Sequence, residues 1–168
     1  MPADKTVSIR PYRPDDLDAV IGIFLGAIRE IAAKDYDPAQ VEAWAQADRD
    51  AWAEARLSRP TWVAVIGRKP VGFTDLEPGG HLDMMFVHPA HQGAGIATAL
   101  LEGVEAAARG QGLSRIFTEA SITARPFFER RGFRLVAAQV VRVRGQVLAN
   151  YRMEKLLIRD RERTGPTD

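Results

Sequence analysis

The chain has 168 residues, 46% hydrophobic and 27% charged, with a formal net charge of +1. This length suits one domain with a buried core, and the balanced charge gives no electrostatic case for nucleic acid or an acidic membrane surface as partner. Cysteine is absent, which excludes disulfides, thiolate-bound zinc and a cysteine nucleophile.

The first half of the chain combines helical and strand patterns. A short strand is expected at 7–12, and apolar residues then recur at three- and four-residue steps over 17–31, which predicts one amphipathic helix. The segment 35–38 breaks that helix, and shorter helical pieces follow around 41–44 and 52–57. Three strands of a meander are then predicted, joined by turns at 67–70 and 78–80. These strands are expected at 62–66, 71–76 and 81–87.

The second half predicts a long helix over 96–108, followed by a strand at 115–120. Because a helix connects it to what precedes, this strand is expected to run parallel to an earlier one. Thr123 is expected to cap a short helix. Strands at 133–143 and 147–156 form a final hairpin. This order of elements predicts a single mixed α/β layer domain.

The ends of the chain bear on its boundaries and location. Residues 1–16 hold no apolar signal-peptide core, and no stretch reaches the roughly 20 apolar residues that cross a bilayer. We therefore expect a cytoplasmic protein. Residues 159–168, RDRERTGPTD, have no apolar face, so we expect a domain at 1–158 followed by a disordered tail.

The most informative segment is 87–101, VHPAHQGAGIATALL. A buried strand ends here, and the glycine-bearing loop 92–95 opens directly into the long helix. Glycine lets the backbone approach a ligand and adopt positive φ. The helix start offers N–H groups without internal partners and a partial positive charge. Together these features predict a receptor for a pyrophosphate group.

Other kinds of protein segment also contain a glycine loop before a helix. A P-loop needs a lysine in its motif, and none follows Gly95. A Rossmann dinucleotide site needs a third glycine after Gly93 and Gly95, which is missing, and Glu119 is the nearest acid to a ribose-binding position. The plainest alternative is an ordinary strand–loop–helix with incidental glycines.

Two blocks of sequence resemble the GNAT superfamily of acetyl-CoA-dependent N-acetyltransferases, in the form found in its generic bacterial branch. The signature [QR]-x-x-G-x-[GA] appears at 92–97, between a V-x-P at 87–89 and an A-L-L at 99–101. A second signature, A-x-x-[FL]-[YF]-E-[KR]-x-G-F, appears at 124–133 as ARPFFERRGF. The resemblance covers nearly the whole chain, and two blocks in this order are far more specific than one glycine loop.

The resemblance implies a GNAT-like fold, a central twisted mixed sheet of about six to seven strands flanked by helices. The strands 81–87 and 115–120 would splay apart, and the pantetheine arm of acetyl-CoA would enter the wedge. Three sets of cofactor-binding residues follow from the resemblance. They are Met85, Phe86 and Val87 along the arm, Gln92, Gly93, Ala94, Gly95, Ile96, Ala97 and Thr98 at the pyrophosphate, and Ser121, Ala124, Phe127 and Phe128 at the thiol end.

The implied reaction is direct attack by a primary amine on acetyl-CoA in a ternary complex, which requires a neutral amine and hence a base. Asp83 is our first candidate, because an acid within an apolar strand is solvated, paired or functional. Glu119 and His81 are further candidates. Many family members protonate the leaving thiolate with a tyrosine where this chain has Phe128, so Tyr151 or solvent is the expected replacement.

The acceptor is expected to lie across the first helices and the last hairpin, with Tyr36, Trp44 and Trp52 as candidate wall residues; core packing is the alternative role for Trp44. A small-molecule amine is the favoured acceptor. The alternatives are a protein lysine or N-terminus, or a non-catalytic acyl-CoA sensor. The final strands, 140–148, could also form a homodimer. The three histidines lack a zinc-like ligand spacing, so we expect no metal site.

Overall fold

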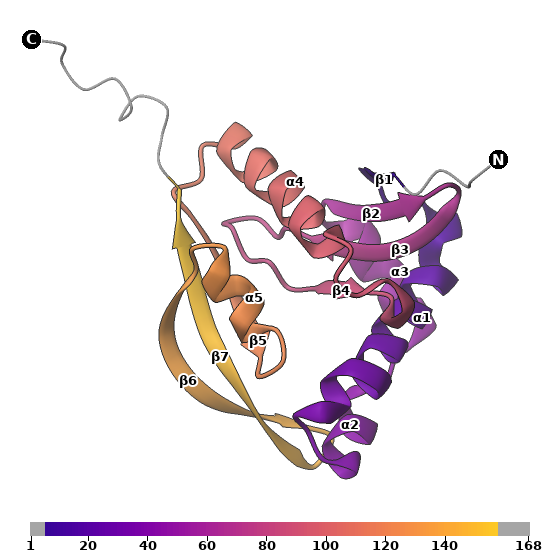
Figure 1. The fold of residues 1–168 in the computed structure, drawn as a ribbon, viewed down its shortest axis with the longest axis vertical. Helices are drawn as coiled ribbons and strands as arrows, with labels where there is room; N and C mark the ends of the chain where they lie inside the picture. Colours follow the sequence, from indigo (N-terminus) through magenta and orange to yellow (C-terminus); the bar gives the residue numbers. More distant parts are fainter. Residues whose placement is uncertain (1–5, 158–168) are drawn as a thin grey trace, which may run out of the picture.

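The protein is described from a computed structural model that covers residues 6–157; the tail predicted at 159–168 lies outside these residues. Seven strands in this part of the chain form two antiparallel sheets, with the orders β1-β2-β3-β4 and β5-β7-β6 (Figure 1). The bounds of the strands are β1 Val7–Pro11, β2 Thr61–Ile66, β3 Lys69–Asp75, β4 Met85–Val87, β5 Arg115–Ser121, β6 Arg134–Val143 and β7 Gln146–Leu156.

Helices cover both faces of the first sheet. The expected helix over 17–31 is present as α1 Leu17–Gly26, which continues into the π-helical turn η2 Ala27–Ile31. None of the helices in the described residues is long and apolar enough to cross a membrane. The remaining helices and short turns are η1 Pro14–Asp16, η3 Ala32–Lys34, α2 Pro38–Trp44, α3 Arg49–Ser58, η4 Pro89–His91, α4 Ile96–Gly110 and α5 Arg125–Arg130.

Strand alternation explains how both faces are buried. Along β2, Val63 and Val65 pack in the cluster that includes α1, whereas Ala64 packs with residues of α4. Gly72 on β3 lets α4 approach closely, because an added Cβ there would lie 3.0 Å from the side chain of Ile96. The helix that opens from the glycine loop is therefore fixed directly on the sheet.

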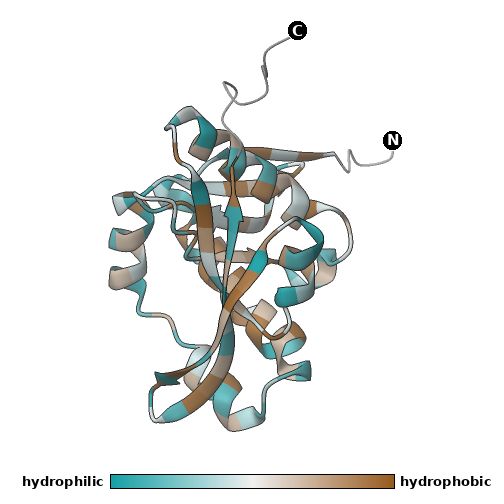
Figure 2. Ribbon diagram, turned by 90° about the vertical axis from the view of Figure 1, so that its left-hand side faces the viewer, coloured by the Kyte–Doolittle hydropathy of each residue, from teal (hydrophilic) through white to brown (hydrophobic). Residues whose placement is uncertain are grey.

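The second sheet has one covered face and one open face. Ile116 and Met153 lie in a core cluster with Phe128 of α5 and residues of α4. The long β6–β7 hairpin carries hydrophobic segments in Figure 2, and exposed side chains there include Val140 and Val147. The hairpin predicted at 133–156 is thus present, with its edge strand β6 exposed.

The two sheets meet at a single isolated bridge and then separate. His81 bridges Phe117 in parallel; the N–H of Leu82 donates to the carbonyl of Phe117 (2.9 Å), and that of Phe117 donates to the carbonyl of Gly80 (3.0 Å). After this point β4 pairs with β3 and β5 pairs with β7. The predicted splay between these two segments is therefore confirmed.

The strand predicted at 81–87 is shorter than expected, since β4 begins only at Met85. The cause is a buried carboxylate: Oδ1 of Asp75 accepts hydrogen bonds from the backbone N–H groups of Asp83 and Met84, each at 2.9 Å. These two amides are consequently unavailable to a neighbouring strand. The expected parallel pairing of residues 115–120 was likewise wrong beyond the His81 bridge, because the ladder of β5 is antiparallel to β7.

The predicted capping role of Thr123 was also wrong. The N-cap of α5 is Ala124, whose N–H donates to the hydroxyl of Ser121 (3.0 Å). The Thr123 hydroxyl instead donates to Oδ2 of Asp35 (2.7 Å), which ties this loop to the segment after η3.

Candidate active site

A cavity of about 850 Å³ lies in the splay between the two sheets, bordered by β4, the glycine loop, β5, α5 and β7. It contains nearly every residue that the sequence assigned to the cofactor. Ala94 is the exception, since it is not among the lining residues. The predicted residues that do line the cavity are Met85, Phe86, Val87, Gln92, Gly93, Gly95, Ile96, Ala97, Thr98, Ser121, Ala124, Phe127 and Phe128.

The glycine loop has the backbone conformation expected of an anion site. Gly93 and Gly95 have φ of 76° and 77°, in the left-handed region, and Gly95 is the N-cap of the 15-residue helix α4. The first N–H groups of such a helix have no internal partner and carry a partial positive charge. Gln92 fixes the loop to β4, because its Nε2 donates to the carbonyl of Val87 (3.0 Å).

Two basic residues beside this loop were missed by the sequence analysis. Arg130 and Arg131, at the end of α5, both line the cavity. The guanidinium of Arg131 donates to the hydroxyl of Thr98 on the first turn of α4 and lies over the ring of Phe127 at 4.9 Å. The signal was present in the second sequence block, FERRGF, where both arginines precede Gly132.

The two phenylalanines of α5 differ in their burial and their neighbours. Phe128 is 4% exposed and packs on Phe133, with ring centroids 5.0 Å apart. Phe127 is less buried and faces Arg131 at the cavity wall. One ring thus belongs mainly to the core and the other mainly to the cavity.

Asp83 and Glu119, the two predicted acids, both line the cavity from opposite sides of the splay. Oδ2 of Asp83 accepts from the guanidinium of Arg59 at 3.3 Å, so the acid is also part of an ion pair. Burial, reinforced by the negative charge of Asp75, raises the pKa of Asp83 above the ordinary 3.8. A carboxyl with a raised pKa is better matched to accepting a proton near neutral pH.

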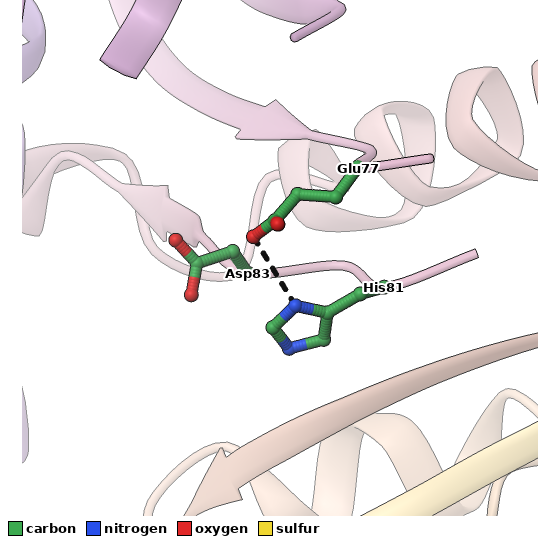
Figure 3. Close-up of side chains that lie close together, drawn as sticks. All are labelled: Glu77, His81 and Asp83. Atoms are coloured by element: carbon green, nitrogen blue, oxygen red, sulfur yellow. Dashed lines mark hydrogen bonds and ion pairs between the residues drawn. The ribbon is translucent and has the colours of Figure 1, made fainter. Parts of the chain in front are cut away.

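His81 lies between the carboxylates of Glu119 and Glu77. Its Nε2 lies 2.6 Å from Oε2 of Glu119, and its Nδ1 lies 3.2 Å from Oε1 of Glu77. Figure 3 shows the Glu77 carboxylate facing the His81 ring, with the carboxylate of Asp83 turned to the other side. Burial lowers the pKa of His81, but the hydrogen bond and charge of Glu119 outweigh it and the pKa is raised above 6.5.

Three of the acidic and imidazole groups at the splay are close enough together to hold a metal ion. Ligand atoms of Glu77, His81 and Asp83 lie within 4.8 Å of one another. However, Nη1 of Arg59 already contacts Glu77 at 2.7 Å and Asp83 at 3.3 Å. A guanidinium at this position neutralises the carboxylates and repels a second cation, so we assign the cluster to an ion-pair network.

Neither Tyr151, the predicted proton donor, nor Tyr36 offers a free hydroxyl to the cavity. Tyr151 is not among the cavity-lining residues, and the guanidinium of Arg125 lies over its ring at 4.3 Å. Tyr36 does line the cavity, but its hydroxyl donates to the carbonyl of Ala149 (2.6 Å) and accepts from the N–H of Ile122 (3.0 Å). The geometry therefore gives no support to Tyr151 as the proton donor.

One end of the cavity is closed by the segment 36–44, which we call the roof. Tyr36 and Trp44 of the roof line the cavity, and α2 lies against the tip of the β6–β7 hairpin (Figure 1). Three hydrogen bonds hold the roof on the hairpin. They join the Tyr36 hydroxyl to the Ala149 carbonyl (2.6 Å), Nε2 of Gln40 to the Val147 carbonyl (2.8 Å), and Nη1 of Arg144 to the Ala43 carbonyl (2.8 Å).

The chain matches a known protein family and a relative of similar length. Residues 32–155 match the family described as the acetyltransferase (GNAT) domain. The chain is 39% identical over 147 residues to the uncharacterized N-acetyltransferase YafP of Escherichia coli (strain K12), covering 88% of this chain and 94% of the relative.

Solved structures of acetyltransferases share this fold. A GCN5-related N-acetyltransferase from Rhodopseudomonas palustris superimposes with a TM-score of 0.88 at 34% identity, covering 94% of this chain and 99% of that one. YncA from Salmonella typhimurium, solved with its cofactor acetyl-CoA, shares the fold with a TM-score of 0.68 at 24% identity, covering 96% and 98% of the two chains.

Proposed function

The chain belongs to the GNAT family of acetyl-CoA-dependent N-acetyltransferases, and we propose that it acetylates a small-molecule primary amine by direct attack in a ternary complex. The observation that carries this proposal is the splay cavity itself. A left-handed glycine loop lies on one border, two carboxylates line the wall, and a roof closes the far end. This arrangement supports a ternary complex with the cofactor along the glycine loop and a compact acceptor under the roof.

The roof favours a small acceptor over a protein lysine or N-terminus. An extended peptide needs an open groove across the sheet, whereas the roof is hydrogen-bonded to the hairpin at Ala149, Val147 and Arg144. Aromatic side chains, including Tyr36 and Trp44, line the cavity under the roof. Turnover with any free amine would exclude the third alternative, a non-catalytic acyl-CoA sensor.

The reaction assigns a role to each part of the cavity. The amine nitrogen attacks the thioester carbonyl carbon, while Asp83 takes the proton, directly or through water. Backbone N–H groups at the splay stabilise the negative charge that develops on the carbonyl oxygen. The C–S bond then breaks, and the coenzyme A thiolate takes a proton from solvent, since a thiol with a pKa of about 8.5 leaves without a dedicated acid.

The reaction class is tested by binding and by thiol release. Calorimetric titration with acetyl-CoA, and with NAD as the control nucleotide, is expected to show selective micromolar binding of acetyl-CoA. Free thiol is expected only when an amine is present. No binding of acetyl-CoA would overturn the cofactor site, whereas binding without thiol release from any amine would support the sensor alternative.

Replacing Asp83 with asparagine is expected to lower kcat by about 10 to 100-fold while the Kd for acetyl-CoA changes little, because general-base catalysis contributes at least this much. Since the base must be ionised, activity of the unmodified protein falls as pH drops through the raised pKa of Asp83. This fall of activity at low pH, the acidic limb of the pH profile, should be absent in Asp83→Asn. Steady-state kinetics across pH provide the measurement.

The matched control is Glu119→Gln, which removes the other cavity carboxylate without changing its shape. If Glu119→Gln abolishes the acidic limb and Asp83→Asn does not, the base is Glu119, with His81 as its partner. If both variants turn over normally, neither acid is the base.

A further inference from the structure

The end of the cavity under the roof is built from aromatic side chains supplied by four separate elements. Neighbouring rings contact one another in a continuous series, and the two least buried, Trp44 and Phe86, turn part of their surface to the cavity. The centroid distances are 4.7 Å for Phe24–Trp52, 5.1 Å for Phe24–Phe86, 6.4 Å for Trp44–Phe86 and 5.4 Å for Tyr36–Trp44.

Aromatic rings pair best with another aromatic ring, in tilted or offset geometries like those already present in this wall. The Trp44 and Phe86 rings are inclined at 60°. A flat ring that entered beside them would extend the same edge-to-face series. Aliphatic neighbours complete this end of the cavity, including Ile31, Val141 and Leu148, so it offers mainly apolar contact.

Beyond the glycine loop, the cavity carries acidic side chains at the splay and a basic side chain at the roof. Asp83 and Glu119 are the only carboxylates among its lining residues, and both lie at the splay. At the roof end the one cation is Arg144, at the tip of the β6–β7 hairpin, held by the Ala43 carbonyl. A polyamine would bring a second ammonium group toward this cation and away from any lining carboxylate, so the electrostatics disfavour it.

The splay end also has an unused hydrogen-bond acceptor. Asn150 lines the cavity opposite Ser121, and its Oδ1 is buried without a partner in the described part of the chain. An unsatisfied buried acceptor destabilises the free protein, and a ligand N–H that reaches it after a small rotation of the amide relieves this cost. An amine at the thioester can supply that N–H.

From this arrangement we propose that the acceptor is an arylalkylamine, with its ring against Trp44 and Phe86 and its amino group beside Asp83 and Glu119. The proposal rests on the acetyltransferase function proposed above and adds the substrate class. It separates this chain's acceptor from polyamines, aminoglycosides and lysine side chains, which lack an aromatic body.

The experiment compares amines at saturating acetyl-CoA by release of free thiol. Phenethylamine is expected to exceed spermidine and a lysine-containing peptide by about 100-fold in kcat/KM. It is expected to exceed 2-cyclohexylethylamine, its saturated counterpart, by about three- to tenfold, the range that aromatic pairing supplies. Equal or better turnover of spermidine, the peptide or the saturated amine overturns the arylalkylamine assignment.

Two tryptophan variants test where the aromatic ring of the acceptor binds. Trp44→Leu is expected to raise KM for phenethylamine about tenfold and to leave KM for acetyl-CoA unchanged, because it removes one ring and keeps an apolar side chain. The matched control is Trp62→Leu, which changes a tryptophan on β2 that does not line this cavity. Thermal melting of both variants checks that they remain folded.

The outcomes separate this inference from the proposed function. If acetyl-CoA does not bind, the proposed function fails. If acetyl-CoA binds and other amines are acetylated while phenethylamine is not, or if Trp44→Leu weakens only the cofactor, the arylalkylamine assignment alone fails. The assignment stands if the preference for the aromatic amine is present and is reduced in Trp44→Leu.

Discussion

Replacing Gly95 with valine is expected to weaken acetyl-CoA binding by about 100-fold or more while the protein stays folded. Gly95 has a φ of 77°, and a β-branched residue in that left-handed region costs at least about 1–2 kcal/mol. The loop would relieve this strain by moving, and the N–H groups that it presents would then turn away from the pyrophosphate. Hydrogen bonds to charged groups are worth about 1.5–3 kcal/mol each, so the loss of two accounts for the expected change.

The position of the side chain adds to this effect. A Cβ on Gly95 would meet no protein atom within 4 Å, so it would project into open space at the mouth of the cavity, where the phosphates are expected to bind. The variant therefore blocks the ligand without clashing with the core. Calorimetry with acetyl-CoA measures the affinity, and thermal melting measures the fold.

Gly67→Val is the matched control. Gly67 has a φ of 63° in the turn between β2 and β3, an added Cβ there also meets nothing within 4 Å, and the residue does not line the cavity. It carries the same kind of backbone strain without any role at the phosphates. If Gly95→Val bound acetyl-CoA as tightly as Gly67→Val does, the phosphate-loop assignment would be wrong.

The features that the sequence predicted well are local ones. A glycine-rich loop before a helix identifies its own backbone geometry, because the residues that set the conformation are the same residues that we propose to bind the pyrophosphate. The same holds for the spacing of apolar residues in α1 and α4. The second block was similarly informative, since its Gly132 has a φ of 90° and directly follows the C-cap of α5.

The features that sequence patterns missed depend on residues distant along the chain. Residues 84–87 are continuously apolar and read as one strand with 81–83. The strand is interrupted because Asp75, eight residues before Asp83, captures two amides with a buried carboxylate. The spacing of apolar residues gives no sign that a side-chain carboxylate will accept the hydrogen bonds that a neighbouring strand would otherwise accept.

Sequence patterns could not place the side chain of Tyr151 for a related reason. Tyr151 was attractive because it lies on the last strand, yet the register of β7 pairs it with Ala120 and leaves it outside the cavity lining. Ala149 and Asn150, its neighbours along the strand, line the cavity instead. Knowing only that these residues form a strand, without its pairing register, does not show which of them face the cavity.

Replacing Arg56 with leucine is expected to lower the free energy of unfolding by about 3–5 kcal/mol. The side chains of Arg56 and Asp75 are 1% and 0% exposed, and Nη1 of Arg56 lies 3.0 Å from Oδ2 of Asp75. Removing the arginine leaves a buried carboxylate whose remaining basic neighbour, Arg59, is 3.8 Å away. The loss is large beside a typical total stability of about 5–15 kcal/mol. Urea unfolding followed by circular dichroism measures it.

The control is Arg49→Leu, which breaks an exposed pair with Asp18. Those side chains are 65% and 80% exposed, and such pairs contribute at most about 1 kcal/mol. If Arg56→Leu were no more destabilising than Arg49→Leu, the buried pair would not be a significant source of stability. Part of the effect of Arg56→Leu also reflects lost packing, since the guanidinium lies 5.5 Å from the Trp52 ring.

A double variant separates the charge from the hydrogen bonds. In Arg56→Leu with Asp75→Asn, the amide oxygen still accepts from the N–H groups of Asp83 and Met84, but no unpaired charge remains in the core. We expect the double variant to recover about half or more of the stability that Arg56→Leu loses, because an unpaired buried charge costs more than a buried amide. Its Kd for acetyl-CoA should stay near that of the unmodified protein, since the segment that opens the splay keeps its anchor. No recovery of stability would mean that packing on Trp52, and not the charge of Asp75, accounts for the loss.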